Sequence, residues 1–549
     1  MEYEACRRKY RLMDQELAQL YYRIKGPVRQ QPRLFVPGDS ALVQERRILD
    51  GLRQEAKHLP VPHPVFHVLQ HHFTDFLDTI DYALKEAENS PQRKYTEFPD
   101  ELLNESRISR QSDEAKLAYL QGCLRQLNDS MDVMEQLLEK RHDSRQRQND
   151  AQNLLHACQQ IREQDVKKLF PSFSQEMCND LDAQLKDFAV ALEAMSEKLD
   201  PHVHEKKTAA SNGKENPART FQMRPYDYRE LLSKQYGVSL DTILIWHKAE
   251  IEKTRAEVMR IASALPIAEK PKDMQDVSKI LFAYEPPCQC AEQMFLKERQ
   301  YLQRTRTLAH EVVHLPEDER CDCVTIPETI KDSFPWGGYE GGDMDVLPFH
   351  GQMFLNQYNV KNISDGWLKL NALHEAYPGH HVQFTRAAVD IRPETVNIGS
   401  KVEPLLEGTC LRTERAFEWI YGEDPFFPLF VAYRRHHASV RILVDLMMFY
   451  YGASLQTVVD IYQRELGFDY VTARGQVQAQ QNMPGYFTSY YYGMKQICSW
   501  EKEYGFSKKE YTELLMSAGF VSIDTFQEIL KLNQEGRDMY FHDFGSLLK

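Results

Sequence analysis

The sequence predicts a mostly α-helical, multi-helical protein with a small β-sheet. Through most of the 549 residues, apolar side chains recur three and four positions apart, as they do along one face of an amphipathic helix. Alternation of apolar and polar residues, the pattern of a half-buried strand, is scarce. Residues 321–360 differ because they are rich in glycine, proline and aromatic residues, which favours short strands and loops. We therefore expect the sheet there and helices elsewhere.

Three regions follow one another along the chain. Residues 1–203 are predicted to be helical almost throughout, with segments such as "CNDLDAQLKDFAVALEAMSEKL". Residues 204–221 are polar and aperiodic, which predicts an exposed loop or linker. Residues 222–549 start with two further helices, the second of which opens at the capping sequence "SLD". After the expected strands, helices return at about residue 366 and continue to the end.

Charge and hydropathy bear on partners and location. The formal net charge of -14 and the lack of a long basic run argue against a nucleic-acid partner. The sequence has no apolar run of 18 residues, and its first residues carry charges throughout. We therefore expect no membrane span and a cytoplasmic location with reduced cysteines. No pattern indicates an oligomeric state.

The ten cysteines include two C-x-C pairs, Cys288 with Cys290 and Cys321 with Cys323. Four thiolates could close a structural zinc site. The usual spacing is C-x-x-C, because the additional residue lets both sulfurs face one metal. We therefore interpret these residues as free or partly buried cysteines.

A complete HExxH motif, "HEVVH", occupies residues 310–314. In zinc peptidases, the two histidines of this motif share one helix face and the glutamate acts as general base. Here Pro316 ends the helix directly after His314, and the acids that follow, Glu319 among them, lie in a turn. We interpret His310 and His314 as the polar end of a helix.

A second stretch, "HEAYPGHH", starts at His374. On a straight helix His380 lies far from the face of His374, and His381 returns to that face about 10 Å along the axis. Neither could then share a zinc ion with His374, because Zn–N bonds are about 2.0 Å long. Pro378 clashes with the carbonyl of His374, so the helix must open, and Gly379 tolerates the angles that this needs. Such a widened turn brings His380 back beside His374.

A third ligand is expected from the helix "VEPLLEGTCLRTERAFEWI", in which Glu403, Glu407 and Glu414 share one face. Glu407 precedes Gly408, which allows a neighbouring helix to approach closely. Two histidines and one glutamate form a His₂Glu set that leaves a coordination position open for water. The predicted ligands of one Zn²⁺ ion are His374, His380 and Glu407.

Four motifs, "HEAYPGHHVQ", "EGTCLRTE", "RILVD" and "NMPGYFTSYYYGMKQI", occur in the order typical of the bacterial domain of unknown function 885. Residues from about 220 to 549 resemble this family, whose typical motifs are HEaxPGHHxQ, EGWALYaE, RlvvD and PGqalsYxxG. The resemblance implies a largely helical, gluzincin-like protein with its metal-site helices in the C-terminal half. Residues 222–549 would then be a metallohydrolase-like catalytic region that acts on peptides or small amides. The resemblance also implies that "HEVVH" is a coincidence.

The match to the family motifs is uneven. Thr409 and Arg412 stand where the family has Trp and Tyr. Phe449 stands where members often have His, and Tyr486 stands where they have Gln. The three predicted metal ligands match the family motifs, and the departures are at residues near them. The matching residues are His374, Glu375, Pro378, Gly379, His380, Glu407, Gly408, Glu414, Arg441, Asp445, Pro484, Gly485, Ser489, Tyr490 and Gly493.

These residues predict a reaction. Glu375 takes a proton from the attacking water and passes it to the leaving amine. A tyrosine hydroxyl is the usual donor to the developing oxyanion in such sites. Tyr490, in "PGYFTSY", is the predicted donor, and its neighbours Tyr491 and Tyr492 are alternatives.

Further residues are predicted to support the ligands or contact the substrate. Arg441 and Asp445 lie four apart on a helix and either pair with each other or let Asp445 orient a ligand histidine. Arg474 could hold a substrate carboxylate. The full set is His381, Glu414, Arg441, Asp445 and Arg474.

Two other functions remain open on the sequence. The departures from the family motifs also fit a catalytically inactive helical binding protein of the same fold. The second is a metal-dependent hydrolase of a non-peptide ester or amide, which differs from the predicted zinc peptidase only in its substrate.

Overall fold

The structure is a computed structural model that describes residues 2–25, 35–96, 102–140, 144–204, 225–326, 328, 331, 336–344 and 346–543. Residues 205–221 of the predicted linker lie outside these ranges. The chain forms two compact units. The first holds Met1–Pro60 and Phe76–Lys214, and the second holds Val61–Asp75 and Glu215–Lys549.

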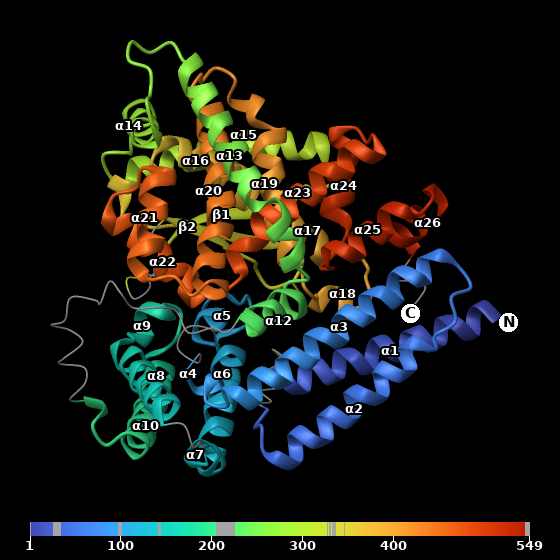
Figure 1. Ribbon diagram of the computed structural model, residues 1–549. Coiled ribbons are helices and arrows are strands. Elements are labelled where there is room, and N and C mark those ends of the chain that lie inside the picture. The colour runs from blue at the N-terminus through green and yellow to red at the C-terminus, as the bar shows by residue number, and fades with distance from the viewer. Residues whose placement is uncertain are drawn as a thin grey trace. The chain divides into compact units, whose positions relative to one another are not determined.

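Helices dominate both units, and within the described ranges three strands form one small sheet (Figure 1). This confirms the predicted fold class. The strands lie within or next to residues 321–360, where the composition placed them.

The first unit is a set of helices around an apolar core. Leu124, Leu154 and Leu181, from three different helices, are fully buried together in it. Its helices are α1 (Glu2–Lys25), α2 (Asp39–Lys57), the part of α3 (Pro64–Asn89) from Phe76 onward, α4 (Arg93–Thr96), α5 (Leu103–Ile108), α6 (Asp113–Asp129), α7 (Met131–Glu139), α8 (Ser144–Glu163), α9 (Val166–Leu169) and α10 (Gln175–Leu199).

The second unit carries the motifs. Its helices before the sheet are α12 (Pro225–Gln235), α13 (Leu240–Ala264), α14 (Met274–Tyr284) and α15 (Ala291–Val312). After the sheet come η3 (Val360–Asn362), α16 (Asp365–Asn371), η4 (Ala372–Ala376), α17 (His380–Val389), α18 (Glu394–Ile398), α19 (Glu403–Ala416), η5 (Glu418–Tyr421), α20 (Phe427–Asp445), η6 (Leu446–Tyr450), α21 (Leu455–Leu466), α22 (Tyr470–Asn482), α23 (Tyr486–Tyr504), α24 (Lys508–Ser517), α25 (Ile523–Lys531), α26 (Gln534–Asp538) and η7 (Met539–Asp543).

The sheet consists of β1 (Arg320–Thr325), β2 (Gly337–Glu340) and β3 (His350–Leu355), in the order β1-β3-β2. β3 pairs in parallel with β1 and antiparallel with β2. Every second side chain of β3 is buried, as expected for a strand with one face on the core. The apolar cluster below it joins Met353 to residues of α15, η4 and α17, so the sheet supports the segment that carries "HEAYPGHH".

Helix starts follow local capping chemistry. α13 begins at Leu240, as "SLD" predicts, and the Ser239 hydroxyl accepts a hydrogen bond from the Thr242 amide at 3.2 Å. α13 packs on α20, α20 packs on α23, and α23 packs on α19 (Figure 1). These helices form the wall of the second unit that holds the glutamates and tyrosines of the motifs.

The first half of α3 differs from the expected division, which placed it in the N-terminal region. Val61–Asp75 belongs to the second unit. The reason is a buried charge, because the Asp75 carboxylate pairs with Lys401 at 2.8 Å and accepts a hydrogen bond from Thr525 at 3.2 Å. Residues so far apart along the chain give no local sign of this pairing.

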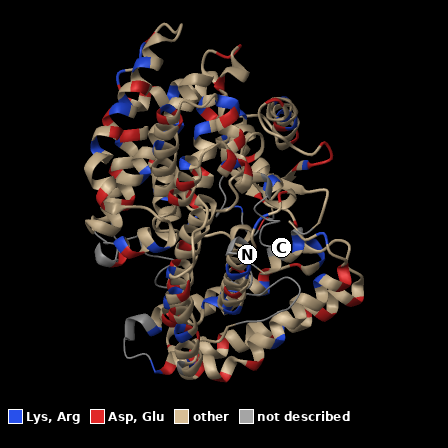
Figure 2. Ribbon diagram, turned by 90° about the vertical axis from the view of Figure 1, so that its right-hand side faces the viewer, with Lys and Arg blue, Asp and Glu red and all other residues tan. Residues whose placement is uncertain are grey.

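Basic and acidic residues are interspersed along the helices (Figure 2). None of the described helices combines the length and the apolar character that crossing a bilayer requires.

Two glycines set the distance between α19 and α23. A Cβ atom on Gly408 would lie 2.5 Å from the carbonyl carbon of Gly493, and a Cβ atom on Gly493 would lie 1.7 Å from the carbonyl oxygen of Pro404. Both positions therefore need hydrogen in place of a side chain. The close approach predicted beside Gly408 is present.

Replacing either of these glycines with alanine should destabilise the protein. The added methyl group meets backbone atoms that cannot move independently, so we expect Gly408→Ala and Gly493→Ala to lose about 1–3 kcal/mol of unfolding free energy. Gly475→Ala is the matched control, because Gly475 lies on α22 with no atom within 4 Å of its added Cβ. Alanine should stabilise that helix by up to about 1 kcal/mol. Urea unfolding measures all three, and equal effects at the three positions would contradict the close contact.

Candidate metal centre

The segment "HEAYPGHH" does not form one helix. His374 lies in the π-turn η4, which ends at Ala376, and Tyr377 is extended with φ -134° and ψ 117°. A new helix, α17, starts at His380. The predicted opening of the helix is at the predicted place, but it is a full break between two helices and not a widened turn within one. The break frees the direction of His380 from the helical spacing that would have separated it from His374.

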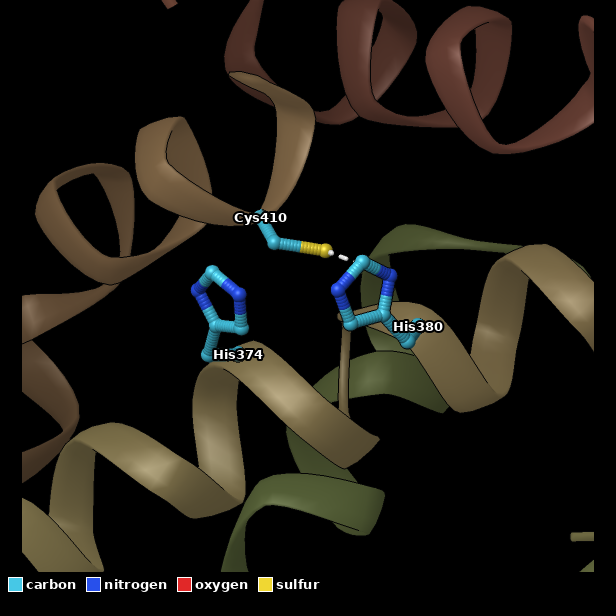
Figure 3. A group of neighbouring side chains, drawn as sticks. All are labelled: His374, His380 and Cys410. Atoms are coloured by element: carbon cyan, nitrogen blue, oxygen red, sulfur yellow. Dashed lines mark hydrogen bonds between the residues drawn. The ribbon is translucent and has the colours of Figure 1, made fainter. Parts of the chain in front are cut away.

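Gly379 makes this break compact. A Cβ atom at this position would lie 1.9 Å from the carbonyl oxygen of His374, so no side chain fits. The backbone at Gly379 therefore packs directly against the carbonyl group of His374 in the preceding turn. As a result the ring centroids of His374 and His380 are 5.1 Å apart, with an angle of 81° between the rings (Figure 3).

Glu407 of α19 lies between the two rings. Its Oε2 atom is 3.2 Å from His374 Nε2 and 3.3 Å from His380 Nε2. Two ligand atoms bound at about 2.0 Å to a tetrahedral ion are about 3.3 Å apart. Both distances from the shared Oε2 atom therefore match the spacing of ligand pairs in a tetrahedral site, and His374 and Glu407 are buried.

The Nδ1 atom of each histidine, which faces away from Glu407, also has a hydrogen-bond partner. Glu414 Oε1 lies 2.8 Å from His374 Nδ1, and Gln383 Oε1 lies 2.9 Å from His380 Nδ1. A carboxylate or amide oxygen at Nδ1 fixes the ring orientation and leaves Nε2 facing inward, which is how metal-binding histidines are usually supported. Glu407 and Glu414 are two helical turns apart on α19, so one helix supplies a contact to both nitrogens of His374.

Cys410, which was not among the predicted site residues, lies beside the two histidines (Figure 3). Its sulfur is 3.5 Å from His380 Nδ1, the nitrogen opposite the one that faces Glu407. Burial raises the pKa of the Cys410 thiol well above its ordinary value, and its sulfur forms a group of three potential ligand atoms with the two histidines, all within 4.8 Å of one another. The signal for it was present, because Cys410 lies three residues after Glu407 on the same helix face.

The cluster is rich in negative charge. Burial, the largest effect on His374, lowers its pKa, but hydrogen bonds to Glu407 and Glu414 outweigh it and raise the pKa to about 10. Burial also opposes charge on His380, and Glu407 raises the pKa of that ring as well. Glu375, half-buried in the same π-turn, adds to both upward shifts. Carboxylates that hold protons on imidazoles also favour a divalent cation in their place.

Of the three tyrosines considered, Tyr490 lies at the cluster. Its ring stacks on His374, with centroids 6.0 Å apart and 10° between the rings. The hydroxyl of Tyr491 instead donates to Glu250 at 2.7 Å. Tyr486 also reaches the site: it donates a hydrogen bond to Glu407, and its hydroxyl is 3.2 Å from that of Tyr490. Tyr486 was seen in the sequence only as a departure from the family motif.

His381 points to another carboxylate. Its Nε2 lies 2.5 Å from Glu319 Oε2, which also accepts a hydrogen bond from the Tyr377 hydroxyl at 2.8 Å. Its Nδ1 is 3.0 Å from the Tyr339 hydroxyl. Glu319, which the sequence placed among the acids of the turn after "HEVVH", directly follows that turn, is buried, and anchors α17 through His381.

The "HEVVH" motif does not place its histidines on one helix face. α15 ends at Val312, and His314 is exposed beyond it. The helix thus ends earlier than Pro316 suggested. Across the part of the chain that the structure describes, no group of three potential ligands includes either histidine, and none includes the cysteines of the two C-x-C pairs.

The remaining predicted residues lie around α20 and α22. Asp445 accepts hydrogen bonds from Gln480 and from Thr488 at 2.8 Å, so the expected pairing with Arg441 is replaced by neutral donors. Glu414, not Asp445, contacts the ligand histidine. Arg474 of α22 donates to Gln478 on its own helix at 3.1 Å.

The fold and the cluster together define a class of protein: a mostly helical chain with a small sheet and a buried His–His–Glu group beside a π-turn. The chain belongs to the family described as "Bacterial protein of unknown function (DUF885)", whose family model matches residues 40–530. The match therefore extends well before residue 220, where the motif resemblance began.

Two solved structures share the fold. A "putative lipoprotein" from Colwellia psychrerythraea has a TM-score of 0.70 at 14% sequence identity and covers 96% of this chain and 97% of its own. A "putative lipoprotein of unknown function" from Shewanella oneidensis has a TM-score of 0.71 at 13% identity, with 95% and 98% covered. No curated protein matches the chain.

Asp445 gives a pH-dependent prediction. Burial raises the pKa of Asp445 to about 7, against the lowering effect of its hydrogen bonds to Thr488 and Gln480. Protonated Asp445 therefore favours the folded state below the unfolded pKa of about 3.9, and this stabilisation is lost as the pH rises to about 7. Asp445→Asn, which stays neutral, should gain stability relative to the wild type between pH 5 and pH 8. Thermal unfolding at both pH values measures the difference in stability between the variant and the wild type. If this difference is the same at pH 5 and pH 8, the pKa of Asp445 is not raised.

Proposed function

We propose that the protein is a zinc-dependent hydrolase, gluzincin-like in its ligand set, that cleaves peptide or small amide bonds. The observation that carries the proposal is the convergence of His374 Nε2, His380 Nε2 and Glu407 Oε2 at distances of 3.2 and 3.3 Å from the shared carboxylate oxygen. Two imidazoles and one carboxylate are the donors of one major class of catalytic zinc site, which keeps one position open. When bound, zinc supplies a Lewis acid that polarises a carbonyl and makes a water molecule more acidic.

The residues around the ligands have separate tasks in this proposal. Glu375 is half-buried next to His374 and takes a proton from the attacking water, then gives it to the leaving amine. Tyr490 donates a hydrogen bond to the oxygen on which negative charge develops. Tyr486 donates to Glu407 and thereby holds that carboxylate in position. Glu414 keeps the His374 ring oriented.

The departures from the family motifs are compatible with this chemistry. Arg412 donates to Glu501 at 2.9 Å and to Thr512 at 3.0 Å, so it fixes α19 through buried packing contacts. Phe449 packs its ring 5.6 Å from that of Tyr228. These contacts support structure around the cluster and leave the donor atoms unchanged. An inactive binding protein of the same fold would keep such packing but would have no use for the acid at position 375.

The zinc content of purified variants shows which of the two motifs, "HEAYPGHH" or "HEVVH", binds the metal. We expect purified protein to bind about one zinc ion per chain, and His374→Ala and His380→Ala to lose it, because each removes one of three donors. His310→Ala is the matched control in the other motif and should keep full zinc content. Inductively coupled plasma mass spectrometry on the purified variants measures this. Loss of zinc in His310→Ala, or retention of zinc in His374→Ala, would show that the metal does not bind at the proposed ligands.

The general base can be tested without disturbing the metal. Glu375→Gln should keep zinc and lose about 10²–10⁴-fold of the wild-type rate, because the amide cannot accept the proton. The control is Glu311→Gln, the corresponding residue of "HEVVH", which should keep the wild-type rate. A peptide library supplemented with ester and amide substrates, read with and without chelator, measures the rates. A zinc-loaded wild type that cleaves none of them would favour the binding-protein alternative.

A further inference from the structure

We propose that Arg434 and Arg441 of α20 form a subsite for a substrate carboxylate beside the metal cluster, so that the enzyme acts at the C-terminal end of its substrate. This rests on the proposed function, because it names the substrate class of the same site. A free carboxylate on the substrate would pair with the two guanidinium groups while the bond to be cleaved lies at the cluster.

The geometry places both arginines next to a residue of the site. Arg434 and Arg441 are seven residues apart, which puts them on one face of α20. Their guanidinium carbons lie 5.5 and 5.6 Å from the centroid of the Tyr490 ring. That same ring stacks on His374 at 6.0 Å. The two cations and a predicted metal ligand therefore all contact one aromatic ring.

Arg441 is a buried cation that has no carboxylate within ion-pair distance in the described part of the chain, although Asp445 and Glu407 act on it electrostatically. It is 5% exposed, yet no ion pair between it and a carboxylate occurs in the described part of the second unit. Its Nη2 donates to Gln476 at 3.2 Å, and the Tyr462 side chain is a further hydrogen-bond partner. Among the residues that the structure describes, Arg441 Nε has no hydrogen-bond partner. Two other buried arginines, Arg386 and Arg412, each pair with carboxylates. A buried charge costs free energy unless it is paired, so Arg441 is poised for an anion.

The groups around the two arginines leave the positive charge in place. His437 lies between them on α20, and burial together with both arginines holds its pKa well below the usual value, so it is neutral. Arg434 is 3.8 Å from Glu414, which is itself engaged with His374. The Phe487 ring lies 4.5 Å from the Arg441 guanidinium, which aromatic faces hold flat and ready for a bidentate carboxylate.

A carboxylate subsite beside the cluster selects the end of the substrate that carries a free carboxylate. We therefore expect removal of residues from the C-terminus, and no cleavage within long chains.

The test compares two ligands that differ only at the terminus: N-acetyl-glycyl-phenylalanine and its C-terminal amide. Binding is measured by calorimetry on chelator-treated protein, so that no metal ion can bind the carboxylate itself. We expect the wild type to bind the acid about tenfold or more tightly than the amide, the usual effect of hydrogen bonds to a charged group. Arg441→Gln should reduce this preference to near unity, and Arg441→Lys should keep part of it.

Two variants keep the test decisive. Arg434→Gln changes a side chain that is 19% exposed and should also weaken the preference even if the Arg441 variants fold poorly, which circular dichroism reveals. Arg474→Gln, the arginine that the sequence suggested for this role, should leave the preference unchanged. Equal binding of acid and amide by the wild type, or a preference lost in Arg474→Gln and kept in Arg441→Gln, would overturn the subsite. Since this preference is measured without metal, absence of hydrolysis would reject the proposed function alone.

Discussion

The return of the backbone at Gly379 against the carbonyl oxygen of His374 is the constraint on which the cluster depends. Helical spacing would separate His374 from His380, because six residues rotate the chain far from its starting face. The break after Ala376 removes that spacing, and the missing side chain at Gly379 keeps the break short. The apolar cluster of α15, β3 and α17 holds the segment from below. The cluster is therefore built by packing around a discontinuity and not by one regular helix.

The second element of the site is the close contact of α19 with α23. Gly408 and Gly493 bring the two backbones together, which places Glu407 within reach of the tyrosines on the neighbouring helix. α19 then supplies Glu407 to the inner nitrogens of the histidines and Glu414 to the outer nitrogen of His374. Inward-facing acids on a buried helix are costly unless they meet cationic partners or a metal. The acids of this helix meet both imidazoles, and Glu414 also lies 3.8 Å from Arg434.

Charge is distributed around the cluster in two layers. Carboxylates surround the imidazoles and raise the pKa of His374 to about 10, so the inner layer favours cations. α20 presents guanidinium groups to the Tyr490 ring, and one of them, Arg441, has no carboxylate within ion-pair distance among the described residues. A site of this kind can hold a cation at its centre and an anion at its edge. The proposed reaction needs both, because hydrolysis requires polarisation of the carbonyl and the substrate requires orientation.

The sequence by itself determined the helical class, the place of the small sheet and the break in "HEAYPGHH", because these follow from periodicity, composition and the chemistry of proline and glycine. It also indicated Glu407 and Glu414, which share a helix face. Only the tertiary structure decided which residues surround them. Tyr486 meets Glu407 from α23, Glu319 became a buried anchor of His381, and Val61–Asp75 joined the second unit through Lys401. Such contacts join residues that are distant along the chain, and local spacing carries no information about them.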